Sequence, residues 1–110
     1  MFHVLTITYL QPPDVIEGTR PAHLQWLTDE VAAGRILLAG RLESQQGAVL
    51  IAGDMSAEQA DAVAAADPYT QAGVARYDRV SFTAGFRATP AWVDRKSTRR
   101  TPVTLRYLVC

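Results

Sequence analysis

The stretch that decides the fold is residues 36–52, ILLAGRLESQQGAVLIA. Two apolar runs, residues 36–42 and 48–52, flank a polar segment that has the length and the glycine typical of a hairpin loop. The pattern predicts two neighbouring antiparallel strands in the middle of the chain. What precedes and follows this hairpin determines the sheet to which it belongs.

The segment before the hairpin reads as one strand and one helix. Residues 2–10 are rich in β-branched and aromatic residues and stop at a proline pair, which indicates a strand followed by a turn. A helix is predicted over residues 21–33, because Pro21 suits a first helical turn and Gly34 a helix end. Its apolar stripe would be Leu24, Leu27 and Val31, with His23 at the border of the core and Trp26 facing away.

The segment after the hairpin repeats this arrangement. Ser56 and Gln59 form the pattern of an N-terminal capping box for a helix that runs to about residue 66. Residues 68–72 then suit one more helical turn, closed by Gly73, and residues 77–86 read as a fourth strand.

The predicted order is therefore β-α-β-β-α-β. This order favours an α+β, ferredoxin-like antiparallel sheet, because right-handed crossovers place both helices on one face. The strands carry apolar residues on both faces, so the helix-free face needs a cover of its own. We expect a second copy of the chain there, in a homodimer whose sheets pair.

This topology brings polar residues that are distant in sequence to one edge of the sheet. His23 and Asp67 are candidates for catalysis, and Asp67 would orient the imidazole. His3 begins the first strand at the opposite end, on the order of 20 Å away. The candidates for substrate binding at this edge are Arg20, Arg41, Ser44 and Tyr69.

Each candidate also has a purely structural interpretation. His23 could pack and hydrogen-bond at the core border, and Asp67, directly before a proline, could serve only as an N-cap. Arg20 could hold an anionic substrate group or a surface ion pair. Tyr69 could donate to a substrate oxygen or fill the turn. The residues alone leave these alternatives open.

Three motifs resemble the YCII-related (YciI-like) family of the dimeric α+β-barrel group. They are RPAHL at residues 20–24, GRILLAG at 34–40, and DPY at 67–69 with AGV at 72–74. The resemblance implies a ferredoxin-like fold whose sheets pair face to face in a dimer, and an active-site His-Asp pair carried here by His23 and Asp67. It also implies chemistry on small molecules, since one relative eliminates chloride from a chlorinated hydroxyhydroquinone.

The formal charge of zero hides two regions of opposite sign. Of the 11 basic and 11 acidic residues, five basic and ten acidic ones precede residue 87, so the body carries −5 and the tail +5. We divide the chain into a domain over residues 1–88 and a basic extension over residues 89–110. The extension could be an added edge strand, a solvated arm or a site for a polyanion, and the strand is preferred because residues 103–109 alternate.

Composition and motifs narrow the function classes. The single cysteine, Cys110, excludes an internal disulfide, and no signal peptide or membrane span is visible, so we expect a cytoplasmic protein. No phosphate loop or metal-binding pattern calls for a cofactor or metal, and the body does not favour nucleic acid as a partner.

Two functions fit. One is a small-molecule lyase or isomerase, with proton abstraction or elimination on a phenolic, lactone or keto-acid-like substrate. The other is a non-catalytic dimer that binds a small anionic or aromatic molecule.

Overall fold

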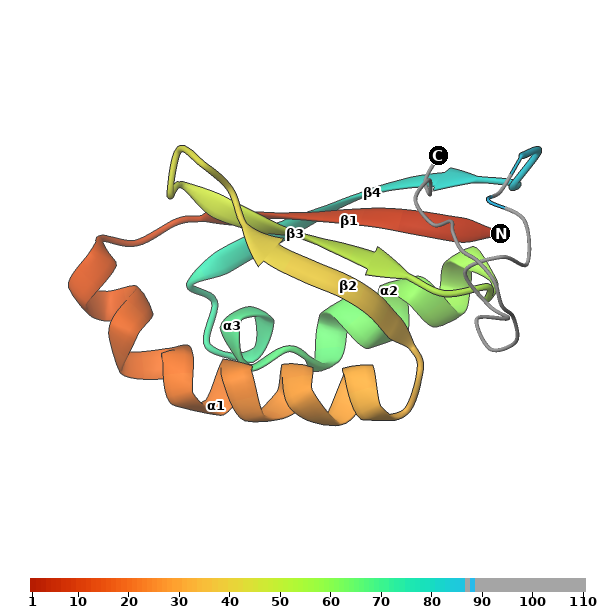
Figure 1. Cartoon of the computed structure of the whole chain (residues 1–110). Helices are drawn as coiled ribbons and strands as arrows, with labels where there is room; N and C mark the ends of the chain where they lie inside the picture. The colour runs from red at the N-terminus through yellow and green to blue at the C-terminus, as the bar shows by residue number, and fades with distance from the viewer. Residues whose placement is uncertain (87, 89–110) are drawn as a thin grey trace, which may run out of the picture.

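The structure of the chain is a computed structural model that describes residues 1–86 and 88. The elements are β1 (Phe2–Tyr9), α1 (Pro13–Ala32), β2 (Ile36–Arg41), β3 (Gly47–Ala52), α2 (Ala57–Ala66), α3 (Pro68–Gln71) and β4 (Ala75–Phe82). The strands form one antiparallel sheet in the order β2-β3-β1-β4, and the helices cover one face of it (Figure 1). The predicted α+β, ferredoxin-like fold is confirmed. The interpretations of residues 89–110 lie outside the described residues.

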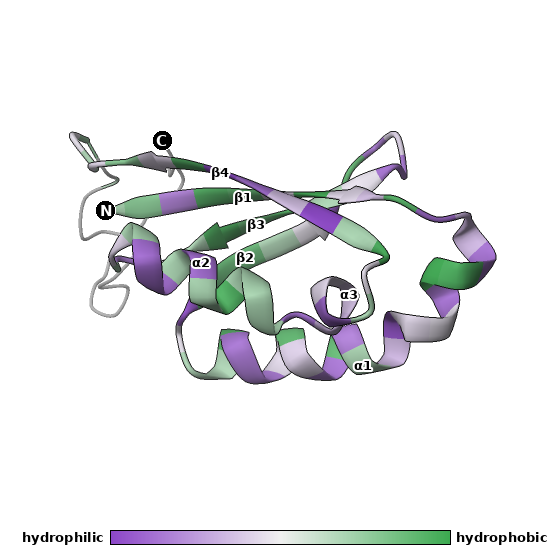
Figure 2. Ribbon diagram, turned by 180° about the vertical axis from the view of Figure 1, so that it is seen from behind, coloured by the Kyte–Doolittle hydropathy of each residue, from purple (hydrophilic) through white to green (hydrophobic). Residues whose placement is uncertain are grey.

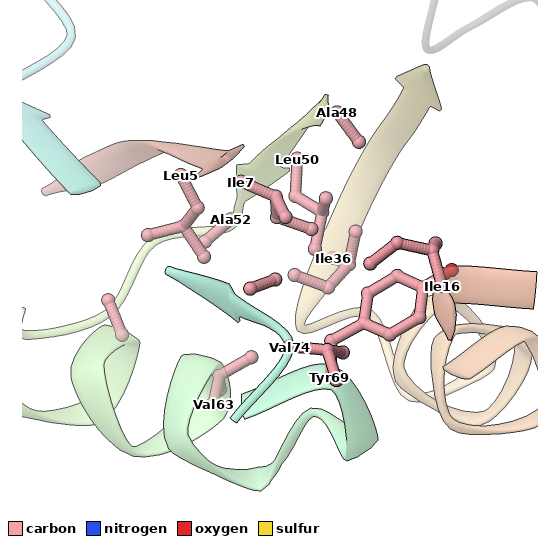
Figure 3. Packing of buried hydrophobic residues seen from close by; sticks show 12 residues of the cluster. Leu5, Ile7, Ile16, Ile36, Ala48, Leu50, Ala52, Val63, Tyr69 and Val74 are labelled. Carbon is pink, nitrogen blue, oxygen red and sulfur yellow. The ribbon is translucent and has the colours of Figure 1, made fainter. Parts of the chain in front are cut away.

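The core lies between the sheet and the helices. Along β1, alternate side chains are buried, and His3, Leu5 and Ile7 point toward the helices. Their neighbours on β3 keep the same alternation, since Leu5 pairs with Leu50 and Ile7 with Ala48. Figure 3 shows this apolar layer meeting residues from all three helices. Period-two burial on the central strands thus fixes which sheet face receives the helices.

The helix-free face of the sheet is also apolar. Val4 pairs with Ile51 on one side and with Val80 on the other, and all three point away from the helices. Hydrophobic residues recur along β1 and β3 in Figure 2. Val80 and Leu38 are 65% and 68% exposed, and Phe82 is 46% exposed. The predicted two-sided apolar character of the strands is confirmed, while the homodimer that would cover this face stays a prediction.

Gly47, at the start of β3, allows the hairpin to approach β1 closely. A Cβ atom at this position would lie 1.8 Å from the backbone carbonyl oxygen of Ile7. Next to it, the backbone N–H of Tyr9 donates to the carbonyl of Gln46 at 3.0 Å. A residue without a side chain is therefore required here, and it seats the hairpin loop against the end of β1.

Helix α1 begins eight residues earlier than predicted. The proline pair read as a turn is its start, with Pro12 extended at the N-cap and Pro13 at the first helical position, where no N–H bond is needed. Pro21, the predicted start, lies inside the helix. Its ring removes one intrahelical bond, a penalty of about 3 kcal/mol in an isolated helix. Packing of α1 on α3 and β2 offsets that loss, so the helix continues through Pro21.

The predicted buried stripe of α1 is wrong at two of its three positions, since only Leu27 packs against the core. Leu24 and Val31 are 44% and 47% exposed, and the buried positions are Ile16, His23 and Glu30. Trp26, expected to face away, is half-buried against the core. The buried face contains polar residues that have partners: Glu30 accepts two bonds of 2.8 Å from Arg35. Apolar periodicity misses a face of this kind, because hydrogen-bonded polar groups can replace hydrophobes on it.

The second half of the chain follows the prediction more closely. The capping box at the start of α2 is present in both directions between Ser56 and Gln59. The turn over residues 68–72 is α3, and Gly73 follows it with a φ of +71°. Strand β4 begins and ends earlier than predicted. Within the described residues, no helix is long and apolar enough to cross a membrane.

Candidate functional site

His23 and Asp67 are joined by a buried hydrogen bond. Nδ1 of His23, in the middle of α1, donates to Oδ1 of Asp67 at 2.8 Å. Asp67 stands between α2 and α3, and the same oxygen accepts the backbone N–H of Tyr69 at 2.9 Å, which caps α3. His23 is 6% exposed and Asp67 is fully buried. Asp67 is therefore both the N-cap of α3 and the hydrogen-bond partner of His23.

A third donor completes the shell of the Asp67 carboxylate. The hydroxyl of Tyr77 on β4 donates to Oδ2 at 2.6 Å. Burial raises the pKa of Tyr77 far above its ordinary range, and the hydrogen bond to Asp67 and the charge of Asp67 raise it further. Tyr77 therefore stays protonated and can only donate. The Asp67 carboxylate thus accepts hydrogen bonds from His23, Tyr69 and Tyr77.

This arrangement fixes the tautomer of His23. Because the buried carboxylate accepts a hydrogen bond from Nδ1–H, the neutral ring presents an unprotonated Nε2. The ring stacks on Tyr69 at 4.1 Å and 10° and lies 5.8 Å from the ring of Trp26. Among the described residues, Nε2 has no hydrogen-bond partner. His23 thus presents an oriented proton acceptor.

The other predicted residues line a pocket of about 330 Å³. Arg20 on α1 and Arg41 at the end of β2 contribute two cationic walls, and Ser44 belongs to the hairpin loop. The side chain of Arg20 is 31% exposed, and its nearest carboxylate, on Glu17, is 3.8 Å away. Because Gly47 lets the hairpin lie close to β1, the hairpin loop forms one side of the pocket.

The candidates therefore form two adjoining groups. His23, Asp67 and Tyr69 are buried together and do not line this pocket, whereas Arg20, Arg41 and Ser44 do. Tyr9 joins the groups, since it lines the pocket and its ring meets the edge of Tyr69 at 5.9 Å. The structure brings all six candidates to one end of the molecule. The arginines line the pocket, whereas His23 and Asp67 are buried beside it.

Sequence reasoning missed Tyr77 and Tyr9. Both were read as ordinary strand residues. Tyr77 pairs with Ile7 across the sheet, and because Ile7 points toward the helices, the same face of β4 carries Tyr77 to Asp67. Strand register, once known, is the signal that finds it.

Two other polar features do not join this site. His3 is fully buried at the far end of β1, with Nδ1 at 2.8 Å from Ser81 Oγ and Nε2 at 2.8 Å from the carbonyl of Met55. A larger cavity of about 500 Å³ lies at the C-terminal end of α1, between Glu30, Arg35 and α2. Its charged groups are already paired, so it offers no reactive side chain. In the described part of the chain, no cluster of three or more His, Cys, Asp or Glu residues could hold a metal ion.

Comparisons with known proteins support the resemblance. A family model described as the YCII-related domain matches residues 1–83. A "12 kDa protein" of Mycolicibacterium smegmatis is 71% identical over 24 residues, which are 22% of this chain and all of that sequence. A similar solved structure is the 5-chloro-2-hydroxyhydroquinone dehydrochlorinase of Burkholderia phenoliruptrix AC1100, in complex with 2,5-dihydroxybenzoquinone. It has a TM-score of 0.59 at 21% identity over 76% of this chain and 95% of that one. At this identity the likeness concerns the fold.

Proposed function

Because this chain belongs to the YCII-related domain family, we propose that it is a small-molecule lyase or isomerase that uses His23 as a general base. The substrate would be a small phenolic, lactone or keto-acid-like compound. The observation that carries the proposal is the buried pair itself: Asp67 holds Nδ1 of His23 at 2.8 Å, and Nε2 has no hydrogen-bond partner among the described residues. A histidine held in one tautomer by a carboxylate is the common arrangement of a catalytic base.

The proposed reaction needs three groups. Nε2 of His23 takes a proton from an acidic phenol, or from the carbon beside a carbonyl, and Asp67 stabilises the imidazolium that forms. Arg20, one turn earlier on α1, stabilises the negative charge that develops on the substrate oxygen. With a chlorinated hydroxyhydroquinone, the proton of one ring hydroxyl would first move to the chlorine-bearing carbon, giving a keto tautomer. His23 would then take the proton of a second ring hydroxyl while chloride leaves that carbon, so that a hydroxyquinone forms and hydrogen chloride is lost overall. The known substrate of the structural neighbour makes this compound the first one to test.

Replacing His23 by asparagine tests the proposal. Loss of a general base is expected to lower turnover about 100-fold to 10,000-fold while the fold survives. Chloride release from 5-chloro-2-hydroxyhydroquinone measures turnover, and circular dichroism checks the fold. The control is Gln25→Ala, an exposed residue of the same helix, which should keep wild-type turnover. Undiminished chloride release in the folded His23→Asn variant would sink the catalytic role.

A non-catalytic ligand-binding protein is the second candidate. It is favoured by one observation, that the pocket of about 330 Å³ is lined by Arg20, Arg41 and Ser44 but by neither member of the buried pair. In that case small anionic or aromatic compounds would raise the melting temperature and be recovered unaltered, with no dependence of any reaction on His23.

We further propose that the chain forms a homodimer through the helix-free face of the sheet. The support is the exposed apolar set on this face, including Val80 at 65% exposure next to Phe82. A monomer would leave this patch in water.

Replacing Val80 by lysine should therefore dissociate the dimer. An unpaired charge buried in the proposed interface is expected to raise the dissociation constant at least about 100-fold. Sedimentation velocity over a concentration series measures the change. The matched control is Leu24→Lys, which places the same charge at an exposed leucine of α1, on the opposite side of the molecule. A wild-type protein that sediments as a monomer, or a Val80→Lys variant that dimerises normally, would contradict the proposal.

A further inference from the structure

One buried polar group has no partner in the described structure. Tyr69 is the largest fully buried side chain, at 1% exposure, and its backbone and ring are well placed against Asp67 and His23. Its hydroxyl, however, is the one buried side-chain oxygen or nitrogen among the described residues that makes no hydrogen bond. An unpaired buried hydroxyl costs free energy, and a bound ligand that offers an acceptor to this hydroxyl would remove the cost.

The neighbours of this hydroxyl are donors. The guanidinium of Arg20 acts on it both as a charge and as a weak hydrogen-bond donor, although no bond of full geometry forms, and an arginine has no acceptor to offer the hydroxyl proton. Burial raises the pKa of Tyr69, the Tyr9 hydroxyl adds to this, and Arg20 offsets part of it. The hydroxyl is therefore protonated at neutral pH. The hydroxyl proton therefore has no acceptor among the described residues, and the cationic donor Arg20 lies beside it.

The missing acceptor is reached from the pocket. Figure 3 shows the hydroxyl end of Tyr69 beside Ile16, and Ile16, Tyr9 and Arg20 all line the pocket of about 330 Å³. The Asp67 carboxylate is engaged with three other donors, so it does not supply the acceptor. Tyr69 does not itself line the pocket, so a ligand oxygen reaches its hydroxyl only when Ile16 or Tyr9 shifts aside.

We propose that an anionic oxygen of the ligand, a carboxylate or an ionised phenol, binds between the hydroxyl of Tyr69 and the guanidinium of Arg20. The proposal rests on the function assigned above and deepens it, because the ligand would already be an anion when it binds. The proton that His23 removes is then a different one, and Tyr69 selects acidic ligands over their neutral ethers or esters. Arg41, on the opposite wall of the pocket, adds a second positive charge that favours the same selection.

Two matched pairs of probes test the selection by titration calorimetry. The first pair is 2,5-dihydroxybenzoquinone, an acidic enol, and its neutral dimethyl ether. The second is 2,5-dihydroxybenzoate and its methyl ester. Wild-type protein should bind at least one acidic member at least about 10-fold more tightly than its neutral partner. The pair that shows the difference tells whether the oxygen comes from an ionised ring hydroxyl or from a carboxylate.

The variants Tyr69→Phe and Arg20→Gln should each remove that preference, and Arg35→Gln, at the other end of α1, should keep it. A second readout separates a ligand role from a structural one. Tyr69→Phe should leave the melting temperature of the ligand-free protein unchanged or higher, because it deletes an unpaired group. Tyr77→Phe should lower it, because that hydroxyl is bonded to Asp67.

Several results would overturn the subsite. They are a lower melting temperature of ligand-free Tyr69→Phe, an acidic preference that survives in this variant, and a wild-type protein that binds none of the four probes at millimolar concentration. The catalytic proposal can fail independently of the anion subsite. If anion binding depends on Tyr69 but no turnover depends on His23, the subsite stands and the catalytic proposal falls. If turnover depends on His23 but the preference for acidic probes does not depend on Tyr69, the catalytic proposal stands and the subsite falls.

Discussion

Replacing Gly47 by alanine is expected to lower the free energy of unfolding by about 4 kcal/mol or more. The new methyl group would meet the carbonyl oxygen of Ile7 at 1.8 Å, far inside contact distance. That oxygen belongs to the backbone of the central strand, so no side chain can swing away to make room. The strands must separate locally, which disrupts the pairing of Thr8 with Gly47 and the bond from Tyr9 to Gln46.

Gly40→Ala is the matched control, because a Cβ atom at Gly40 would meet nothing within 4 Å. This substitution should change the free energy of unfolding by no more than about 1 kcal/mol, and in the stabilising direction if it only restricts the unfolded chain. Urea unfolding at one fixed protein concentration measures both variants, since oligomerisation would make stability depend on concentration. Equal stability of the two variants would show that the close approach of β3 to β1 is wrong.

Replacing Asp67 by alanine should destabilise the protein by about 3 to 5 kcal/mol and also remove turnover. The substitution strands three buried donors: Nδ1 of His23, the backbone N–H of Tyr69 and the hydroxyl of Tyr77. Because these donors come from α1, α3 and β4, the loss is felt by three elements at once. The effect should exceed that of removing any one donor.

The control is Asp29→Ala on the exposed side of α1. Asp29 is exposed and its carboxylate accepts one surface hydrogen bond from Gln25 at 3.1 Å, so its removal should change the free energy of unfolding by no more than about 1 kcal/mol. Thermal and urea unfolding of both variants should therefore separate them clearly. A difference below about 1 kcal/mol between Asp67→Ala and Asp29→Ala would contradict the network described around the Asp67 carboxylate.

The order of elements was predictable from the sequence, and the orientation of α1 was not. Strand alternation, the hairpin between residues 36 and 52, and the capping box at Ser56 are local signals, and local interactions produce them. The start and buried face of α1 depend on contacts that form only in the folded chain. Pro21 is tolerated because the helix is packed, and Glu30 is buried because Arg35 meets it.

The site was predictable to the same extent. Topology alone brought His23 and Asp67 to one end of the sheet, and the structure joins them by a hydrogen bond, although their catalytic role stays a proposal. The tyrosines were not predictable as site residues, since a strand tyrosine looks the same whether its hydroxyl meets water or a buried carboxylate. Only the register that places Tyr77 opposite Ile7 reveals the difference.

The triple engagement of Asp67 has a consequence for how such a protein can diverge. The carboxylate begins a helix and anchors a strand in addition to orienting the imidazole, so selection for folding alone is enough to keep it. His23 carries no comparable architectural duty beyond its stacking on Tyr69. If His23 is the base proposed above, a lineage that loses the reaction can lose the histidine and still keep the aspartate. On that proposal the identity of residue 23, and not that of residue 67, would mark which related proteins keep the reaction.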